Sequence, residues 1–472
     1  MLIRQTLIKS VYFFLSLAFV SSCKVAEPPQ MPTMEKMPST FAEETDSISI
    51  GDIAWQDFFN DPYLVALIDT GINHNLDLLS AVQRIEIARA NYDIRQGALL
   101  PTVDARFRVR SGNIRRNWLR GTINGDSNVP GQTENHFFGL QSTWEADLWG
   151  KLKSQREASY ARFLATEKGK HLVTTSLVAE ITRLYYELLG LDYELETIQK
   201  NIELQEVGQN VIEIQKIGGR ATELAVQQFR AQVLRTRSLG YEKKQRIVEV
   251  ENQLNLLLGR YPQPIERGET IVDQQLPKFI EAGIPSSLLR RRPDIQQTEL
   301  ELVAAKADVE AARAAFLPAL TITPYAGFHA NSLPSLFTTP ESLVAGLLGG
   351  VTAPIFYQKR LKSEYSQMVA RNLQAFYDYQ QSILNGYQEV LTNLQRVENY
   401  TQAYEMRQQE TDVLLEAVST SNDLFAAGYA TYLEVITAQE RVLDAELNMI
   451  NTRKEIFLSL TSLYQSLGGG WQ

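Results

Sequence analysis

The side chains that most often do chemistry in enzymes are scarce in this chain of 472 residues. It contains one cysteine, Cys23, and four histidines, which are His74, His136, His171 and His329. No two histidines have the spacing that puts two metal ligands on one face of a helix, and one thiol cannot build a zinc site of several thiolates. A Ser-His-Asp or Cys-His arrangement and a glycine-rich phosphate loop are also missing. We therefore expect no enzyme activity, no metal site and no cofactor.

The chemistry that Cys23 could undergo is the attachment of lipid. A basic start precedes an apolar run, Val11 to Val20, which is too short to cross a bilayer as a helix. Small residues then lead to the cysteine in Val20-Ser-Ser-Cys23, which resembles the cleavage site of bacterial lipoproteins. We expect residues 1–22 to be a signal peptide and Cys23 to be the lipid-bearing first residue of the exported chain. The alternative is an ordinary signal peptide beside a free cysteine.

The overall composition excludes several classes of protein. Charged residues make up 21% and apolar residues 44% of the chain, so most of it is neither disordered nor a bundle of membrane helices. The net charge of −9 argues against nucleic acid as the main partner.

One repeated stretch organises the rest of the chain. Ala88–Pro101 returns as Ala305–Pro318, and both copies read as the end of a helix that a proline terminates. After each proline, apolar and polar residues alternate as in a strand, and a second alternating run follows a loop. Long stretches without proline come next, each interrupted by glycine, at Gly218-Gly219 and at Gly428. The sequence predicts a tandem repeat of helix, β-hairpin and long helix pair.

The boundaries of these parts follow from the same signals. We expect an extended tether over residues 23–50, a first repeat over 51–259 with its hairpin at about 102–149, a connecting segment over 260–284, a second repeat over 285–468 with its hairpin at about 319–357, and a tail over 469–472.

Two apolar stripes are expected on the helices. A helix or broken helix is expected from Asp61-Pro62 to about Leu100, with an apolar stripe marked by Leu76, Leu79, Val82, Ile85 and, less regularly, Ile87. The helix that ends near Leu258 carries Ile247, Val250, Leu254 and Leu257, which follow the spacing of a coiled-coil seam.

The hairpins have the length and pattern of membrane strands. Their alternating runs are close to the roughly 9–11 residues that cross an outer membrane. In a barrel wall the apolar face would meet lipid, and Arg106, Arg108 and Arg110 would face a wet lumen. This arginine row could favour anions, or Asp104, Glu145 and Asp147 could offset it, and the sequence leaves both open.

Four strands cannot close a barrel, because the smallest outer-membrane barrels have about eight strands and an open edge is not tolerated in lipid. The chain is therefore expected to be an oligomer of at least two copies.

Several motifs together resemble one known family. They are Leu288-Leu-Arg-Arg-Arg-Pro-Asp-Ile295, Ala315-Phe-Leu-Pro-Ala-Leu320, Asp147-Leu-Trp-Gly-Lys151 and Gly428-Tyr-Ala-Thr-Tyr-Leu-Glu-Val435. The chain resembles the outer membrane factors of the TolC/OprM type, in the NodT-type lipoprotein branch that serves efflux systems. The resemblance implies an α+β membrane protein. Its fold would be a trimeric 12-stranded outer-membrane β-barrel continued by a periplasmic α-helical barrel.

The resemblance also implies the partners and the working parts. The partners would be a periplasmic membrane-fusion adaptor, an inner-membrane pump of the RND type, and outer membrane lipid. The helix tips that contact the adaptor would be Gly218, Gly219 and Arg220 in the first repeat, and Ala427, Gly428 and Tyr429 in the second.

The tunnel gate would lie close to these tips. Its candidates are Asp423, Leu424 and Tyr432, each of which could equally be an outward-facing surface residue. Trp118, Trp144 and Trp149 are candidates for an aromatic belt at the membrane surface.

The expected function is a passive exit duct in a tripartite efflux system, which passes small molecules to the exterior. One alternative is a structural coiled-coil lipoprotein of the envelope without a pore, whose hairpins pack on its own helices. Another is the same duct serving metal-cation or protein export.

Overall fold

The computed structural model describes residues 31–34, 36–41, 49–112, 133–275, 283, 285–338, 340–354 and 358–471. Cys23 and Trp118 lie outside these residues. The chain divides into two compact units, and each draws on both predicted repeats. The first unit holds residues 87–163 and 300–377, together with the N-terminal residues to Pro32. The second holds residues 33–86, 164–299 and 378–472.

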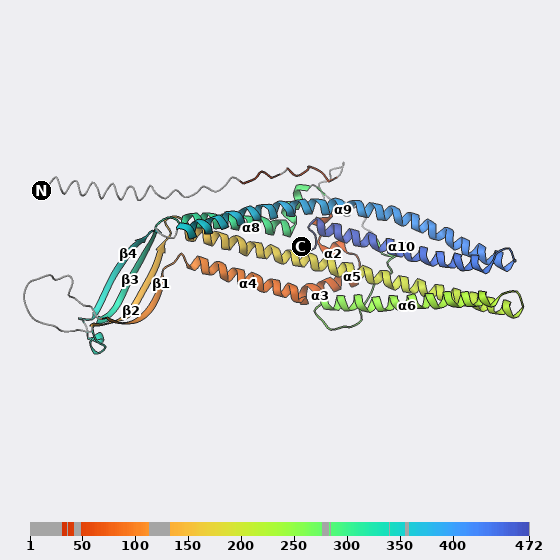
Figure 1. Cartoon of the computed structure of the whole chain (residues 1–472), viewed down its shortest axis with the longest axis horizontal. Coiled ribbons are helices and arrows are strands. Elements are labelled where there is room, and N and C mark those ends of the chain that lie inside the picture. The colour runs from red at the N-terminus through yellow and green to blue at the C-terminus, as the bar shows by residue number, and fades with distance from the viewer. Residues whose placement is uncertain are drawn as a thin grey trace, which may run out of the picture. The chain divides into compact units, whose positions relative to one another are not determined.

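Helices make up most of the described chain (Figure 1). The α-helices are α2 (Trp55–Phe58), α3 (Pro62–His74), α4 (Leu76–Gly97), α5 (Lys151–Ile217), α6 (Glu223–Leu257), α7 (Leu288–Arg291), α8 (Pro293–Ala314), α9 (Gln358–Ala426) and α10 (Tyr432–Ser466). Short 3-10 helices are η1 (Ile50–Asp52), η2 (Pro285–Ser287) and η3 (Pro334–Phe337). None of the described helices is both long and apolar enough to span a membrane.

The four strands form one antiparallel sheet in the first unit. They are β1 (Thr102–Gly112), β2 (Thr133–Ala146), β3 (Ala319–Ala330) and β4 (Leu343–Thr352), in the order β1-β2-β3-β4. The two predicted hairpins thus lie side by side, because β2 of the first pairs with β3 of the second. Strands β1 and β4 are the edges of the sheet within the chain.

Two tryptophans hold the segments in which α4 leads into β1 and α8 leads into β3. The Trp144 indole N–H donates to the carbonyl of Leu99 at 3.0 Å, and that of Trp149 donates to the carbonyl of Pro318 at 2.8 Å. The carboxylate of Asp147 accepts from the backbone N–H groups of Leu152 and Lys153, and so caps the first turn of α5. These bonds explain why an Asp-Leu-Trp-Gly motif stands where strand gives way to helix.

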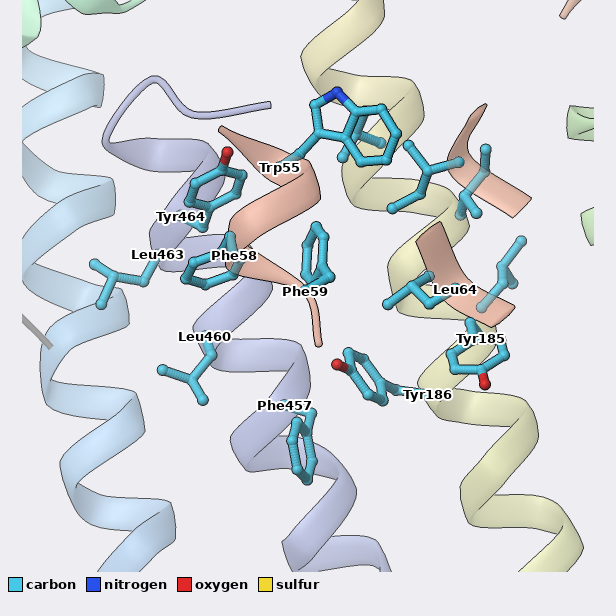
Figure 2. Packing of buried hydrophobic residues seen from close by; sticks show 14 of the residues in the cluster. Trp55, Phe58, Phe59, Leu64, Tyr185, Tyr186, Phe457, Leu460, Leu463 and Tyr464 are labelled. Atoms are coloured by element: carbon cyan, nitrogen blue, oxygen red, sulfur yellow. The ribbon is translucent and has the colours of Figure 1, made fainter. Parts of the chain in front are cut away.

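The main hydrophobic core belongs to the second unit. Phe58 of α2 stacks on Tyr464 of α10 at a ring separation of 4.1 Å, and Tyr186 of α5 stacks on Phe457 at 4.7 Å (Figure 2). Such aromatic pairs add about 0.5–1.5 kcal/mol beyond the area they bury. They tie the short helix α2 to the two long helices.

The stripe predicted on α6 is confirmed, whereas the stripe predicted on α4 is only partly buried, at Val82 and Ile85. Val250 and Leu254 of α6 are fully buried, as the coiled-coil seam requires. On α4 the buried residues are instead Leu78 and Ala81. Leu76 and Leu79 are exposed, because no other part of the described chain covers that face of the helix.

The Arg-Arg-Pro-Asp-Ile motif contains a buried clamp. The Arg292 guanidinium binds both carboxylate oxygens of Asp294, at 3.0 and 2.7 Å, and a carboxylate oxygen of Glu389 at 2.6 Å. It also donates to the backbone carbonyl of Ser466 at 3.0 Å. Arg292 therefore joins the start of α8 to α9 and to the end of α10.

Candidate functional site

One face of the sheet is apolar across all four strands. The register puts Phe107 opposite Phe138, Phe138 opposite Phe328, and Phe328 opposite Leu343. Directly paired residues share a face of an antiparallel sheet, so these four side chains form one apolar row. The face stays exposed in the single chain: Val103 is 66% and Val351 70% accessible.

This exposure speaks against hairpins that pack on the chain's own helices. Phe337 of η3 contacts the rings of Phe138 and Phe328, and it is itself 63% exposed. A continuous apolar surface of this kind requires lipid or another chain to cover it.

The opposite face is polar on its first three strands. Asp104 lies opposite Gln141, which lies opposite Tyr325, and Arg108 lies opposite Phe137, which lies opposite His329. Arg106 and Arg108 therefore share this face, as predicted from their spacing. Arg110 of β1 pairs with Asn135 of β2, and the side chain of Arg110 lies outside the described residues. On β4 the polar pattern fails, because Leu348 is on this face opposite Thr323.

The two helix tips are built alike. Gly219 and Gly428 have φ angles of 73° and 82°, a backbone conformation that glycine adopts most readily. The N–H of Arg220 donates to the carbonyl of Gln215, and that of Tyr429 to the carbonyl of Leu424, both at 2.8 Å. This six-residue closure is the Schellman motif that ends helices at a glycine. Both predicted turns are therefore tight and well hydrogen-bonded.

A threonine begins each returning helix. Thr222 accepts from the Ala225 N–H at 3.3 Å at the start of α6, and Thr431 is the N-cap of α10. Lys216 and Glu223 form an ion pair across the first turn. At the second turn, Thr431 and Glu434 make a capping box, in which each side chain bonds the other residue's backbone N–H.

A small apolar cluster brings the two tips together in the second unit. Its buried members are Ile212, Ala225, Phe229, Val435 and Ile436, from α5, α6 and α10. Ala221 of the first turn and Tyr432 beside the second pack against it.

A polar layer separates this cluster from the apolar residues further along the helices. Gln205, Gln232 and Gln439 are buried at the layer, which also borders a cavity of about 340 Å³. The Gln232 amide donates to Gln439 at 3.5 Å, whereas neither amide atom of Gln205 has a partner among the described residues.

The gate candidates occupy different environments. Asp423 and Leu424 are exposed on the last turn of α9, while Tyr432 is partly buried against the tip cluster. Tyr429 is 85% exposed at the outermost part of the turn. Among the described residues, no group of three His, Cys, Asp or Glu side chains is placed to hold a metal ion.

A buried network that the sequence did not reveal lies in the second unit. Asp61 caps α3, and its carboxylate accepts from the Tyr185 hydroxyl at 2.6 Å and from the Gln274 amide at 2.9 Å. Burial, and then the bond to Asp61, raise the pKa of Tyr185 well above its usual range. The only signal in the sequence was the helix start at Asp61-Pro62. The partners come from distant segments, so spacing could not have identified them.

Comparisons with known proteins give a consistent result. The model of a family described as "outer membrane efflux protein" matches residues 67–260 and again residues 284–469. The chain is 28% identical over 461 residues to the probable outer membrane lipoprotein SilC of Salmonella typhimurium, with 96% of each chain covered. It is 27% identical over 470 residues to the cation efflux system protein CusC of Escherichia coli O6:H1, with 98% of this chain and 99% of that protein covered.

A solved structure agrees with this result at the level of the fold. The outer-membrane channel OprN superposes with a TM-score of 0.85 at 23% identity, over 95% of this chain and 100% of that one.

Proposed function

Since the chain belongs to the outer membrane efflux protein family, it is the outer-membrane exit duct of an efflux system, and we propose that three copies form each duct. It lies in the outer membrane and extends into the periplasm. The observation that carries the proposal is the four-stranded sheet, with its uncovered apolar face and two unpaired edges.

The geometry of the sheet supports a closed assembly. Strands β1 and β4 present unpaired N–H and C=O groups, which lipid cannot satisfy. If β1 of one copy pairs with β4 of the next, three copies make a barrel of twelve strands, an even number above the minimum of about eight. The apolar face would then meet lipid, and the face with Arg106 and Arg108 would line the lumen.

The helices support a tunnel below the barrel. Helix α5 has 67 residues and α9 has 69, so each is about 100 Å long at 1.5 Å per residue. The exposed stripe on α4, with Leu76, Leu79, Ile87 and Ile94, offers an apolar surface to a neighbouring copy. We propose that the helices of three copies form an α-helical barrel in the periplasm.

The helix tips are the proposed contact with the periplasmic adaptor. Gly218, Gly219 and Arg220 with Ala427, Gly428 and Tyr429 form exposed turns at which a periplasmic membrane-fusion adaptor would bind. The adaptor would connect the duct to an inner-membrane pump of the RND type. The duct itself would do no chemistry, and the pump would supply the energy.

The duct would also have a gate at its closed end and a lipid anchor at its N-terminus. Asp423, Leu424 and Tyr432 would form rings at the closed end, because threefold symmetry turns one residue into three. Lipid on Cys23 would fasten the N-terminus to the membrane, and the name of the relative SilC, an outer membrane lipoprotein, supports this. The same family model matches the chain twice, at residues 67–260 and 284–469, which supports the proposed repeats over 51–259 and 285–468.

A test of the duct uses the purified full-length chain in detergent and in planar bilayers. We expect trimers that resist heating in detergent, and ion-conducting channels. We also expect that Asp423→Ala changes the conductance or the cation selectivity, because it would remove three carboxylates from the narrowest part. A monomeric rod without conductance would refute the duct, and an unchanged Asp423→Ala channel would remove that residue from the gate.

The cargo has a second candidate. The relative CusC is named for cation efflux, which favours metal cations as an alternative to other small molecules. CusC and this chain are 27% identical, and the charges along the proposed lumen bear on the cargo independently of that name.

A further inference from the structure

The charges on the polar face of the sheet are unequally distributed along the strands. Asp104 and Glu145 lie near the helix joints, whereas Arg106 and Arg108 lie further along β1, toward the loop between β1 and β2. The register places neutral side chains or His329 beside both arginines: Gly139 and Gly327 follow Arg106, and Phe137 and His329 follow Arg108.

The carboxylates that could offset the arginines are engaged elsewhere. Glu145 forms an ion pair with Lys151 at 2.5 Å. Asp147 accepts two backbone hydrogen bonds at the start of α5. Each of these carboxylates is therefore already balanced, by an ammonium group or by the positive end of a helix.

Asp104 is the carboxylate of β1 itself, and it makes only a long ion pair with one arginine. Its distance to the Arg106 guanidinium is 3.7 Å, and both side chains are well exposed to solvent. Arg108 is also exposed, and no carboxylate of the described residues lies within ion-pair distance of it. Glu341 precedes β4 in a turn and belongs to neither face. Among the side chains that the structure describes, one positive charge on this part of the face is therefore uncompensated.

The surroundings of the arginines suit an organic anion. Phe137 and Tyr325 contact edge to face at a ring separation of 6.1 Å. In the register, the pair Gly139 and Gly327 lies between the row of paired residues that contains Phe137 and the row that contains Tyr325. Neither glycine has a side chain that could cover this part of the face. A guanidinium binds carboxylate, sulfate or phosphate oxygens through paired N–H groups, and aromatic rings accept the apolar part of such a molecule.

We propose that this part of the strand wall favours anions over cations in the lumen, and that Arg108 is the residue that determines the preference. The proposal rests on the duct function, which puts the polar face on the lumen side. It names small anions as the favoured cargo class, in contrast to the cations in the name of CusC. Three copies would place three such guanidinium groups around one lumen.

The test is a charge series in planar bilayers with the full-length protein. Reversal potentials across a potassium chloride gradient give the chloride-to-potassium permeability ratio. Low salt is needed, because the screening length is about 30 Å at 0.01 M but only about 8 Å at 0.15 M. For Arg108→Gln we expect the ratio to fall by about twofold or more at low salt, from the loss of three charges near the ion path.

Two matched variants separate charge from shape. Arg108→Lys keeps the charge and should leave the ratio unchanged, whereas Asp104→Asn removes the opposing carboxylate and should raise it. If Arg108→Gln does not fold, Asp104→Asn carries the same test in the opposite direction. Conducting channels with one permeability ratio across the series would overturn the anion preference. A wild-type protein that does not conduct would instead refute the duct.

Discussion

Replacing Arg292 by methionine tests the role of the buried clamp. Methionine keeps an unbranched apolar stem of similar length to that of arginine but removes every donor of the guanidinium. The carboxylates of Asp294 and Glu389 and the carbonyl of Ser466 then lose their partner. The side chain of Arg292 is 9% exposed, that of Asp294 26% and that of Glu389 51%.

These exposures determine the expected size of the effect. Breaking a fully buried ion pair costs about 3–5 kcal/mol, because a charge is left without a partner in a medium of low polarity. Here Glu389 can recover water almost completely and Asp294 in part, so the loss should be smaller. We expect Arg292→Met to lower the free energy of unfolding by about 2–3 kcal/mol. Arg292→Lys should recover part of the loss, because one ammonium cannot replace a bidentate guanidinium.

The assay is urea unfolding of the detergent-solubilised protein, followed by its helical circular dichroism signal. The matched control is Arg360→Met on the exposed start of α9, where the side chains of Arg360 and Glu364 are 72% and 45% accessible. That pair should contribute about 0.5 kcal/mol or less. An Arg292→Met protein whose unfolding midpoint matches that of Arg360→Met would show that the clamp does not hold the three helices together.

Two further predictions concern polar side chains of the second unit, the half-buried His171 and the buried Gln205. His171 stacks on Trp471 at 4.5 Å, and burial, then Lys168 and Lys170, lower its pKa below the ordinary value of 6.5. The unfolded chain therefore binds the proton more readily than the folded chain, so the stability of the protein falls as the pH drops below about 6.5. In thermal melts, His171→Gln should lose less stability between pH 7 and pH 5 than the wild-type protein does. Equal acid sensitivity of the two proteins would contradict this. Gln205→Leu removes a buried amide that has no partner among the described residues, and it should raise the free energy of unfolding by about 1–3 kcal/mol. The control is Gln209→Leu on the same helix, where the side chain is half-buried and its amide donates to Glu213. A lower melting temperature would mean that the Gln205 amide is satisfied in the folded protein.

Local patterns were sufficient to predict the elements and their order. A proline closes each repeated stretch and follows a helix end by four residues, because α4 ends at Gly97 before Pro101 and α8 ends at Ala314 before Pro318. The alternating residues that follow form β1 and β3. Gly219 and Gly428 at the tips adopt the positive φ angles that are typical of the position after a long helix. Such features depend on neighbours in the sequence, and their physics is therefore visible without a fold.

Long-range partners were not predictable in the same way. The clamp of Arg292 joins residues from three segments, and the network of Asp61 joins three more. Leu76 and Leu79 of α4 were wrongly expected to be buried, because hydrophobic spacing identifies an apolar face but does not identify what covers it.

The sequence by itself determined the tandem repeat, the proline and glycine boundaries, and the arginine row on one face of the first strand. Whether nearby carboxylates cancel that row was decided only by the tertiary structure. Glu145 is paired with Lys151, Asp147 caps a helix, and Asp104 stays 3.7 Å from Arg106. Charge balance depends on distances of a few ångströms between atoms, because ion pairs weaken quickly in water. Spacing along a chain cannot supply those distances, whereas the register of a folded sheet does.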